Sequence, residues 1–121
     1  MLIKSFKEIE AYKRSYKIAL AIHKATLKFP PIEQYALASQ MRRASKSVCA
    51  NIAEGFGRHH SSTADFKRFL VISSSSCDEM LVWIDFAKDL TYIHDGIWEE
   101  WTQEYVEIAK MINGLSRNWK T

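Results

Sequence analysis

Glycine and proline, the residues that most often end helices, are scarce in this chain and lie mainly where long helical patterns stop. The 121 residues include four glycines and two prolines. Pro30-Pro31, Gly55, Gly57 and Gly96 fall at breaks between patterns, and only Gly114 falls within one. Because a proline pair cannot continue a helix and no run shows the sustained alternation of a strand, the chain divides into four helical segments. We expect them at about residues 7–29, 32 or 33–56, 63–90 and 97–119.

Each segment carries apolar side chains at the spacing of one helix face. In the first segment this face comprises Ile9, Tyr12, Tyr16, Ala19, His23 and Thr26, with Leu20 and Leu27 alongside. In the second and fourth it comprises Leu37, Met41, Val48 and Ile52, and then Trp101, Tyr105, Ile108, Ile112 and Leu115. Ser62 or Thr63 can cap the third segment. Four amphipathic helices with short connections predict an all-α, up-and-down antiparallel four-helix bundle, and the length suits a single domain over residues 1–121.

The third segment has two apolar faces instead of one. The first comprises Phe66, Leu70, Ser73, Cys77, Met80, Ile84 and Ala87. The second, expected on nearly the opposite side, comprises Ile72, Glu79, Trp83, Phe86 and Leu90. A helix that is apolar on two sides either is central in the fold or meets a second subunit. A homo-oligomer is therefore one of the two explanations of the second apolar face.

A row of polar residues runs beside the core-facing stripe of the second segment. It comprises Gln40, Arg43, Ser47, Asn51 and Glu54, and Glu79 of the third segment is expected to join it. Such a row can satisfy its hydrogen bonds across a helix–helix or subunit seam, where it specifies register more than it adds stability. We interpret these residues as a structural network. Arg42 and Lys46, at other positions of the helix, are expected to point into solvent.

Charge is divided unevenly along the chain. Residues 1–60 hold eleven Lys and Arg against four Asp and Glu, a balance of +7, and residues 61–121 hold six against ten, a balance of −4. A basic face is the usual mark of polyanion binding, although charged faces that are simply solvated would give the same pattern. The residues expected to contact nucleic-acid phosphates are Arg14, Lys17, Arg42, Lys46, Arg58, Lys67 and Arg68.

Catalytic and cofactor sites find little support among the residues. Glu54 and Glu79 could meet as paired carboxylates, but neither has the histidine three residues on that a di-metal bundle requires. His59-His60 has no Cys or carboxylate at ligand spacing, and no glycine-rich phosphate loop follows a strand. His23 fits a hydrogen-bonded core residue, and Cys49 and Cys77 fit small buried thiols. We therefore expect no enzymatic activity, no metal and no cofactor.

The expected compartment is the cytoplasm. No apolar run approaches the roughly 18 residues of a membrane span, and the first residues carry charges where a signal peptide would be apolar. We expect no membrane partner.

Two long motifs connect the chain with a known family. They are FPPIEQYALASQMRRASKSVCANIAEGFGR and FKRFLVISSSSCDEM, and their most specific positions are Phe29-Pro30, Tyr35, Leu37, Gln40, Arg42-Arg43-Ala44, Ser47, residues 51–55, Ser76 and Glu79. In these residues the chain resembles the bacterial four-helix bundle proteins encoded in intervening sequences of large-subunit ribosomal RNA genes. Its SSSS run with Cys77 replaces the small residues that members commonly carry, which does not threaten the fold.

The resemblance implies a cyclic homo-oligomer, by preference a pentamer. The family is similar to the accessory proteins of diversity-generating retroelements, which form homopentameric barrels with a basic surface and bind nucleic acid. For the family itself no biochemical activity is established. Two interpretations remain: an oligomer that binds RNA or DNA without reading its sequence, and an interaction scaffold that presents its acidic half or its aromatic residues to another protein.

Overall fold

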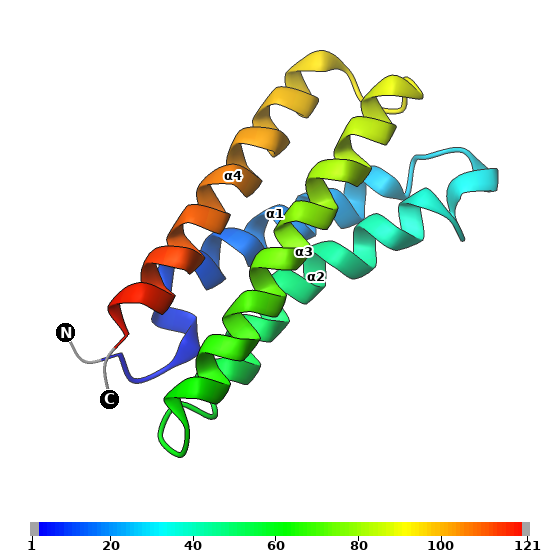
Figure 1. The fold of residues 1–121 in the computed structure, drawn as a ribbon. Coiled ribbons are helices and arrows are strands. Elements are labelled where there is room, and N and C mark those ends of the chain that lie inside the picture. Colours follow the sequence, from blue (N-terminus) through cyan, green and yellow to red (C-terminus); the bar gives the residue numbers. More distant parts are fainter. Residues whose placement is uncertain (1–2, 120–121) are drawn as a thin grey trace.

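The chain forms a four-helix bundle in a computed structural model that describes residues 3–119 (Figure 1). The helices are α1 Glu10–Thr26, α2 Leu37–Phe56, α3 Thr63–Asp89 and α4 Asp95–Asn118, with two 3-10 turns, η1 Phe6–Glu8 and η2 Pro31–Glu33. Within the described range there is no strand. The predicted third and fourth segments agree with α3 and α4 to within two residues, whereas α1 and α2 begin later because each is preceded by a 3-10 turn.

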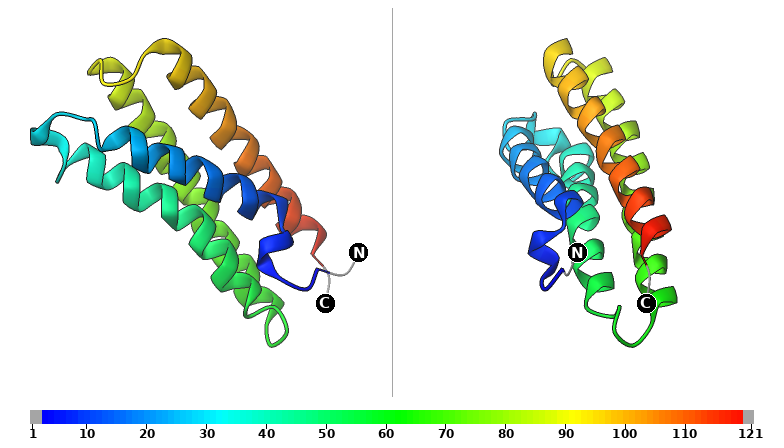
Figure 2. Two further views of the ribbon diagram at one scale, coloured as in Figure 1. Left: turned by 180° about the vertical axis from the view of Figure 1, so that it is seen from behind. Right: turned by 90° about the vertical axis from the view of Figure 1, so that its left-hand side faces the viewer.

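Each helix runs back along the one before it, so α1 pairs with α2 and α3 pairs with α4 (Figures 1 and 2). Helix α2 also lies along α3, which makes these two helices the centre of the bundle. Ser62 caps α3, since its Oγ accepts a hydrogen bond from the backbone N–H of Asp65 at 3.0 Å, as the sequence predicted.

The core is built from the predicted faces of α2 and α4 and from the first predicted face of α3. Its largest fully buried side chains include Met41, Ile52, Phe66, Leu70, Met80, Ile84, Tyr105, Ile108 and Ile112. Burying one such aliphatic or aromatic side chain contributes about 1.5–3 kcal/mol to the free energy of unfolding. Only Leu115, among the residues expected in these faces, is half-buried.

The predicted face of α1 is wrong at its centre. The residues that α1 buries are Ala11, Ser15, Ile18, Ala19, Ile22 and Thr26. Tyr16 and Leu20 are exposed, and His23 is half-buried at the edge, where its Nδ1 lies 3.0 Å from Lys46 Nζ. The physical reason is that small residues let α1 approach the bundle closely, which leaves the larger rings beside the contact and not inside it.

Gly55 marks the closest approach of α2 and α3. A Cβ atom on Gly55 would lie 2.7 Å from Phe69 Cβ and 3.2 Å from the backbone oxygen of Phe66. Real Cβ atoms do not approach this closely, so the glycine at the end of the polar row serves packing. Gly114 lies within α4 with nothing near its Cβ position, so the helical pattern continues through it.

The second apolar face of α3 is exposed and lies along α2 instead of on the opposite side of the helix. Its Glu79 contacts Arg43 of α2, and Trp83 bonds to Glu79. Phe86 is 51% exposed and Leu90 46% exposed. Trp83 is half-buried, so the uncovered part of this face within residues 3–119 is made by Ile72, Phe86 and Leu90.

Candidate nucleic-acid interface and the polar row between α2 and α3

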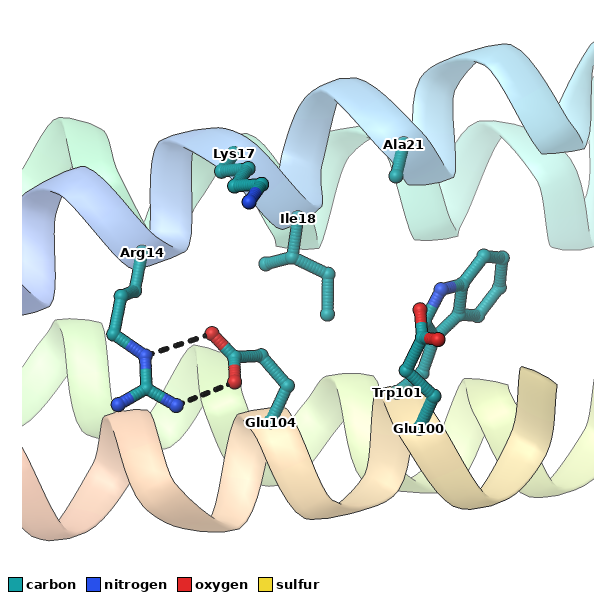
Figure 3. Close-up of a pocket in the computed structure, with 7 residues that line it drawn as sticks. All are labelled: Arg14, Lys17, Ile18, Ala21, Glu100, Trp101 and Glu104. Carbon is teal, nitrogen blue, oxygen red and sulfur yellow. Dashed lines mark hydrogen bonds and ion pairs between the residues drawn. The ribbon is translucent and has the colours of Figure 1, made fainter. Parts of the chain in front are cut away.

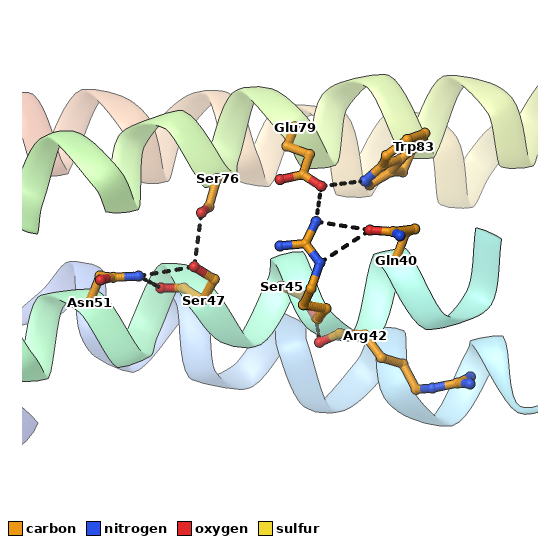
Figure 4. Close-up of polar contacts among 9 residues, drawn as sticks. Gln40, Arg42, Ser45, Ser47, Asn51, Ser76, Glu79 and Trp83 are labelled. Atoms are coloured by element: carbon orange, nitrogen blue, oxygen red, sulfur yellow. Dashed lines mark hydrogen bonds and ion pairs between the residues drawn. The ribbon is translucent and has the colours of Figure 1, made fainter. Parts of the chain in front are cut away.

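The polar row begins with a cluster around Arg43 (Figure 4). The guanidinium donates to Gln40 Oε1 from Nε at 3.1 Å and from Nη2 at 2.9 Å, and it pairs with the Glu79 carboxylate of α3. Trp83 Nε1 donates to the same carboxylate oxygen at 2.9 Å. The cluster lies at the surface, since the Arg43 side chain is 55% exposed, so the ion pair contributes at most about 1 kcal/mol in a single chain.

A second cluster lies two turns further along α2. Ser47 Oγ is 3.0 Å from Ser76 Oγ of α3, and Asn51 Nδ2 donates to both the carbonyl and the hydroxyl of Ser47 at 2.8 and 2.9 Å. Deeper in the same contact, Ser73 Oγ donates to the Val48 carbonyl at 2.6 Å. The serines of α3 therefore act as small donors and acceptors between two closely packed helices.

Glu54 does not join either cluster. Its carboxylate accepts from Arg58 at 3.3 Å within the turn that follows α2. Glu54 and Glu79 are therefore engaged by two different arginines and do not form the paired carboxylates of an acid–base site. The structure brings together Gln40, Arg43 and Glu79, and separately Ser47 and Asn51.

Arg42 does not point into solvent, and that prediction is wrong. Its Nη1 donates to the buried hydroxyl of Thr26 at 3.1 Å and its Nη2 donates to the carbonyl of Gln34 at 2.9 Å. Figure 4 shows the side chain leaving α2 on the side away from Glu79 and Trp83. The loop carbonyls between α1 and α2 attract the guanidinium, and periodicity within α2 alone does not contain that information.

Arg14 is held by α4. It makes a two-pronged contact with Glu104, with Nε at 2.9 Å from Oε2 and Nη2 at 2.5 Å from Oε1 (Figure 3). These hydrogen bonds raise the pKa of Arg14 above its ordinary value. The pair closes one end of a slot of about 260 Å³ between α1 and α4, which Lys17, Glu100 and Trp101 also line.

The other residues predicted to contact phosphates differ in their exposure and in whether they form ion pairs within the chain. Arg58 pairs with Glu54 and Asp65, Arg68 pairs with Asp65 at 3.1 Å, and both guanidiniums lie 5.0 Å from the centre of the Phe69 ring. Lys67 is half-buried. Lys17 is exposed and has no ion pair among residues 3–119.

Two lysines that were not among the predicted phosphate contacts lie in line with Lys17 along the helix. Lys24 lies two turns further along α1, and Lys28 follows just after the helix. Residues seven and eleven apart fall on one side of a helical path, so the three form a lysine row, Lys17, Lys24 and Lys28. All three are exposed, and none has an ion pair in the described part of the chain. Counting lysines seven and eleven residues apart in the first segment would have found them.

The charge asymmetry follows the helix pairs. Helices α1 and α2 together carry seven Lys and Arg against two Asp and Glu, whereas α3 and α4 carry five against ten. The acidic residues of α4 line a shallow depression beside Arg14 and include Glu99, Glu100, Glu104 and Glu107. One side of the bundle is therefore basic and the other acidic.

Other candidate chemistry lies outside this interface. Among residues 3–119 no three His, Cys, Asp or Glu side chains are placed to hold a metal ion. His59 stacks on Phe56, with ring centres 4.4 Å apart, and its ring packs against that of His60 at 3.8 Å. Both thiols are buried and free, and burial raises the pKa of Cys77 to about 12. In the same range no helix is long and apolar enough to cross a membrane.

The comparisons with known proteins place the chain in a family. The family model described as 23S rRNA-intervening sequence protein matches residues 7–114. The chain belongs to this family. Among solved structures, the chain is similar to a protein of unknown function from the S23 ribosomal protein family of Bacteroides thetaiotaomicron. The two are 25% identical, the match covers 89% of this chain and 96% of the other, and the TM-score is 0.78. No curated protein matches the chain.

The loop between α1 and α2 is built around a polar frame that the sequence did not predict. Gln34 Nε2 donates to the carbonyls of Thr26 and Phe29 at 2.9 and 3.0 Å. Tyr92, from the loop before α4, donates to Glu33 Oε2 at 2.8 Å, and this hydrogen bond raises the pKa of Tyr92. These hydrogen bonds tie the loop to the end of α1 and to the loop before α4.

Proposed function

We propose that this member of the family works without catalysis, as a homo-oligomer that binds RNA or DNA through the phosphate backbone. The observation that carries the proposal is the lysine row of α1, which is exposed and belongs to the basic pair of helices. Its first member, Lys17, borders the slot that Glu100 and Glu104 of α4 also line. Free lysines can neutralise phosphates, whereas Arg14, Arg42, Arg58 and Arg68 already bind partners within the chain. The chain contains no base-reading motif, so binding should be indifferent to sequence.

An oligomer can present more phosphate contacts than a single chain. Three lysines in one chain make few phosphate contacts, but a ring repeats them around one surface, and linked contacts raise the overall affinity without any new contact. We propose a closed ring, by preference a pentamer, because the exposed face of α3 requires a cover and the family resemblance suggests this number. The cytoplasm is the proposed compartment.

The test is a titration of labelled duplex DNA and structured RNA with the wild-type protein at low salt. Replacing Lys17 and Lys24 by Glu should weaken binding to unrelated sequences by similar factors, since phosphate contacts carry no sequence information. Replacing Lys110 of α4 by Glu changes the net charge in the same direction at an exposed position of the acidic side and should have a much smaller effect. Absence of binding by either nucleic acid at micromolar wild-type protein would refute this function.

An interaction scaffold is the second candidate, and one observation favours it. Ile32 and Tyr35, in the framed loop before α2, are 82% and 98% exposed. Aromatic side chains held in place before binding are typical anchors of protein interfaces. If the titration shows no nucleic-acid binding, this loop becomes the first surface to test.

A further inference from the structure

Two exposed apolar strips lie on the two sides of α2. The α1 strip comprises Tyr16, Leu20 and Leu27. The α3 strip comprises the exposed Ile72, Phe86 and Leu90 together with the half-buried Trp83. The α1 strip borders a groove of about 330 Å³ whose lining includes Lys46 and Cys49 of α2. The α3 strip borders α2 through the contact of Glu79 with Arg43. Figure 4 shows α2 running between α1 and α3.

We infer that the α1 strip of one copy packs against the α3 strip of the next copy, so that the ring on which the proposed function depends is built head to tail. An interface between two different patches leaves one of each patch free at the ends of a short chain of copies. Closure by rotation then buries every strip, whereas an interface between identical patches would stop at a dimer. A single type of contact thus buries both strips, because the α3 strip of one copy covers the α1 strip of the next.

Charge complementarity favours a second copy over a foreign protein. The α1 strip lies on the basic pair of helices, with Lys46 in the groove and with Lys24, which has no ion pair within residues 3–119, one turn from Leu20. The α3 strip lies on the acidic pair, with Asp89 one turn from Phe86 and Asp78 one turn from the exposed Val82. Juxtaposing the two strips brings opposite charges together around an apolar centre, the usual composition of a specific interface. Two copies of the same strip would bring like charges together.

The experiment uses two variants, each blocked at one strip. Leu20→Glu places a carboxylate in the α1 strip, and Phe86→Glu places one in the α3 strip; both positions are about half exposed, so each variant should fold. By light scattering at micromolar concentration, each variant alone should have the 14.0 kDa mass of one chain. An equal mixture should form a dimer containing one chain of each variant, because the intact α3 strip of the first can bind the intact α1 strip of the second. The two altered strips would repel each other, so the mixture should stop at two chains.

The matched control is Val106→Glu, at an exposed aliphatic position of α4 outside both strips, which should assemble like the wild type. A mixture of the blocked variants that stays monomeric would overturn the pairing, and so would full assembly of either variant alone. Neither result contradicts the oligomer of the proposed function as long as the wild-type protein assembles. A monomeric wild type would refute the oligomer and this pairing together. Circular dichroism of each variant confirms that loss of assembly is not loss of fold.

Discussion

Replacing Arg42 separates a structural arginine from a phosphate contact. Its guanidinium binds the hydroxyl of Thr26, which is fully buried, and the carbonyl of Gln34 in the loop before α2. Removing it in Arg42→Ala leaves two acceptors without their donor. The loss of a charged hydrogen-bond donor from a partly buried acceptor costs about 1.5–3 kcal/mol, and because the two bonds share one side chain we expect about 2–3 kcal/mol in total.

The expected change in melting temperature is large enough to measure. For a domain of this length, about 1 kcal/mol corresponds to roughly 3–5 °C, so Arg42→Ala should melt about 6–15 °C below the wild type. Arg42→Lys keeps the charge but loses the two-pronged geometry, and it should lose most of the same stability. Lys46→Ala serves as the control, since Lys46 is exposed on the same helix and should cost less than about 1 kcal/mol.

The assay is thermal unfolding followed by circular dichroism, together with the nucleic-acid titration on each folded variant. If Arg42 is structural, Arg42→Lys lowers the melting temperature while its affinity for duplex DNA at a temperature well below the transition stays near that of the wild type. An Arg42→Ala protein that melts within about 1 °C of the wild type and binds nucleic acid weakly would refute the argument, because the side chain would then be free in solution.

Three further changes test the packing. Gly55→Ala should destabilise the fold by about 1–3 kcal/mol in denaturant unfolding, because its Cβ would lie 2.7 Å from Phe69 Cβ, whereas Gly57→Ala, with 3.4 Å to its nearest neighbour, should be tolerated. Thr91→Gly should raise the melting temperature by an amount equivalent to about 1 kcal/mol. Thr91 has a φ of 65°, a backbone conformation that costs free energy for a β-branched residue and little for glycine. A variant that melts below the wild type would contradict this account. Tyr105→Phe should be neutral or stabilising by up to about 1 kcal/mol, as the fully buried hydroxyl has no hydrogen-bond partner among residues 3–119; a loss above 1 kcal/mol would mean that it does.

Periodicity predicted the parts of the fold in which burial alone decides the position of a residue. The faces of α2, α3 and α4 combine large aliphatic and aromatic residues at helical spacing, and no alternative face is equally apolar. The face of α1 failed because two faces of that helix compete in apolar character. Ile18 and Ile22 lie on the buried face, but Ala11 and Ser15, which continue it, carry little apolar weight. Tyr16, Leu20 and Leu27 made the neighbouring exposed face look equally apolar. Close approach between helices depends on both surfaces together, and one sequence segment contains only half of that information.

The sequence predicted which residues line the seam between α2 and α3, but not the partners of the arginines. The seam between α2 and α3 contains the residues expected there, apart from Glu54, because side chains three and four apart share one side of a helix. The role of Arg42 depended on a loop carbonyl eight residues earlier in the chain, and Arg14 depended on Glu104. Contacts of this kind join distant segments, so only the assembled bundle reveals which basic residues remain free.

The lysine row sets the salt dependence expected of one chain that binds a duplex through that row alone. If Lys17, Lys24 and Lys28 each neutralise one phosphate of a duplex, log affinity should fall with log salt by about 2.7, at about 0.9 for each contact. A ring that places two or more copies on the same duplex should exceed this slope, whereas the monomeric Phe86→Glu variant, whose lysine row is unchanged, should not. Measuring both slopes therefore counts the copies that bind together. Equal slopes for ring and monomer would mean that each duplex contacts one chain at a time, and that assembly serves a purpose other than multiplying phosphate contacts.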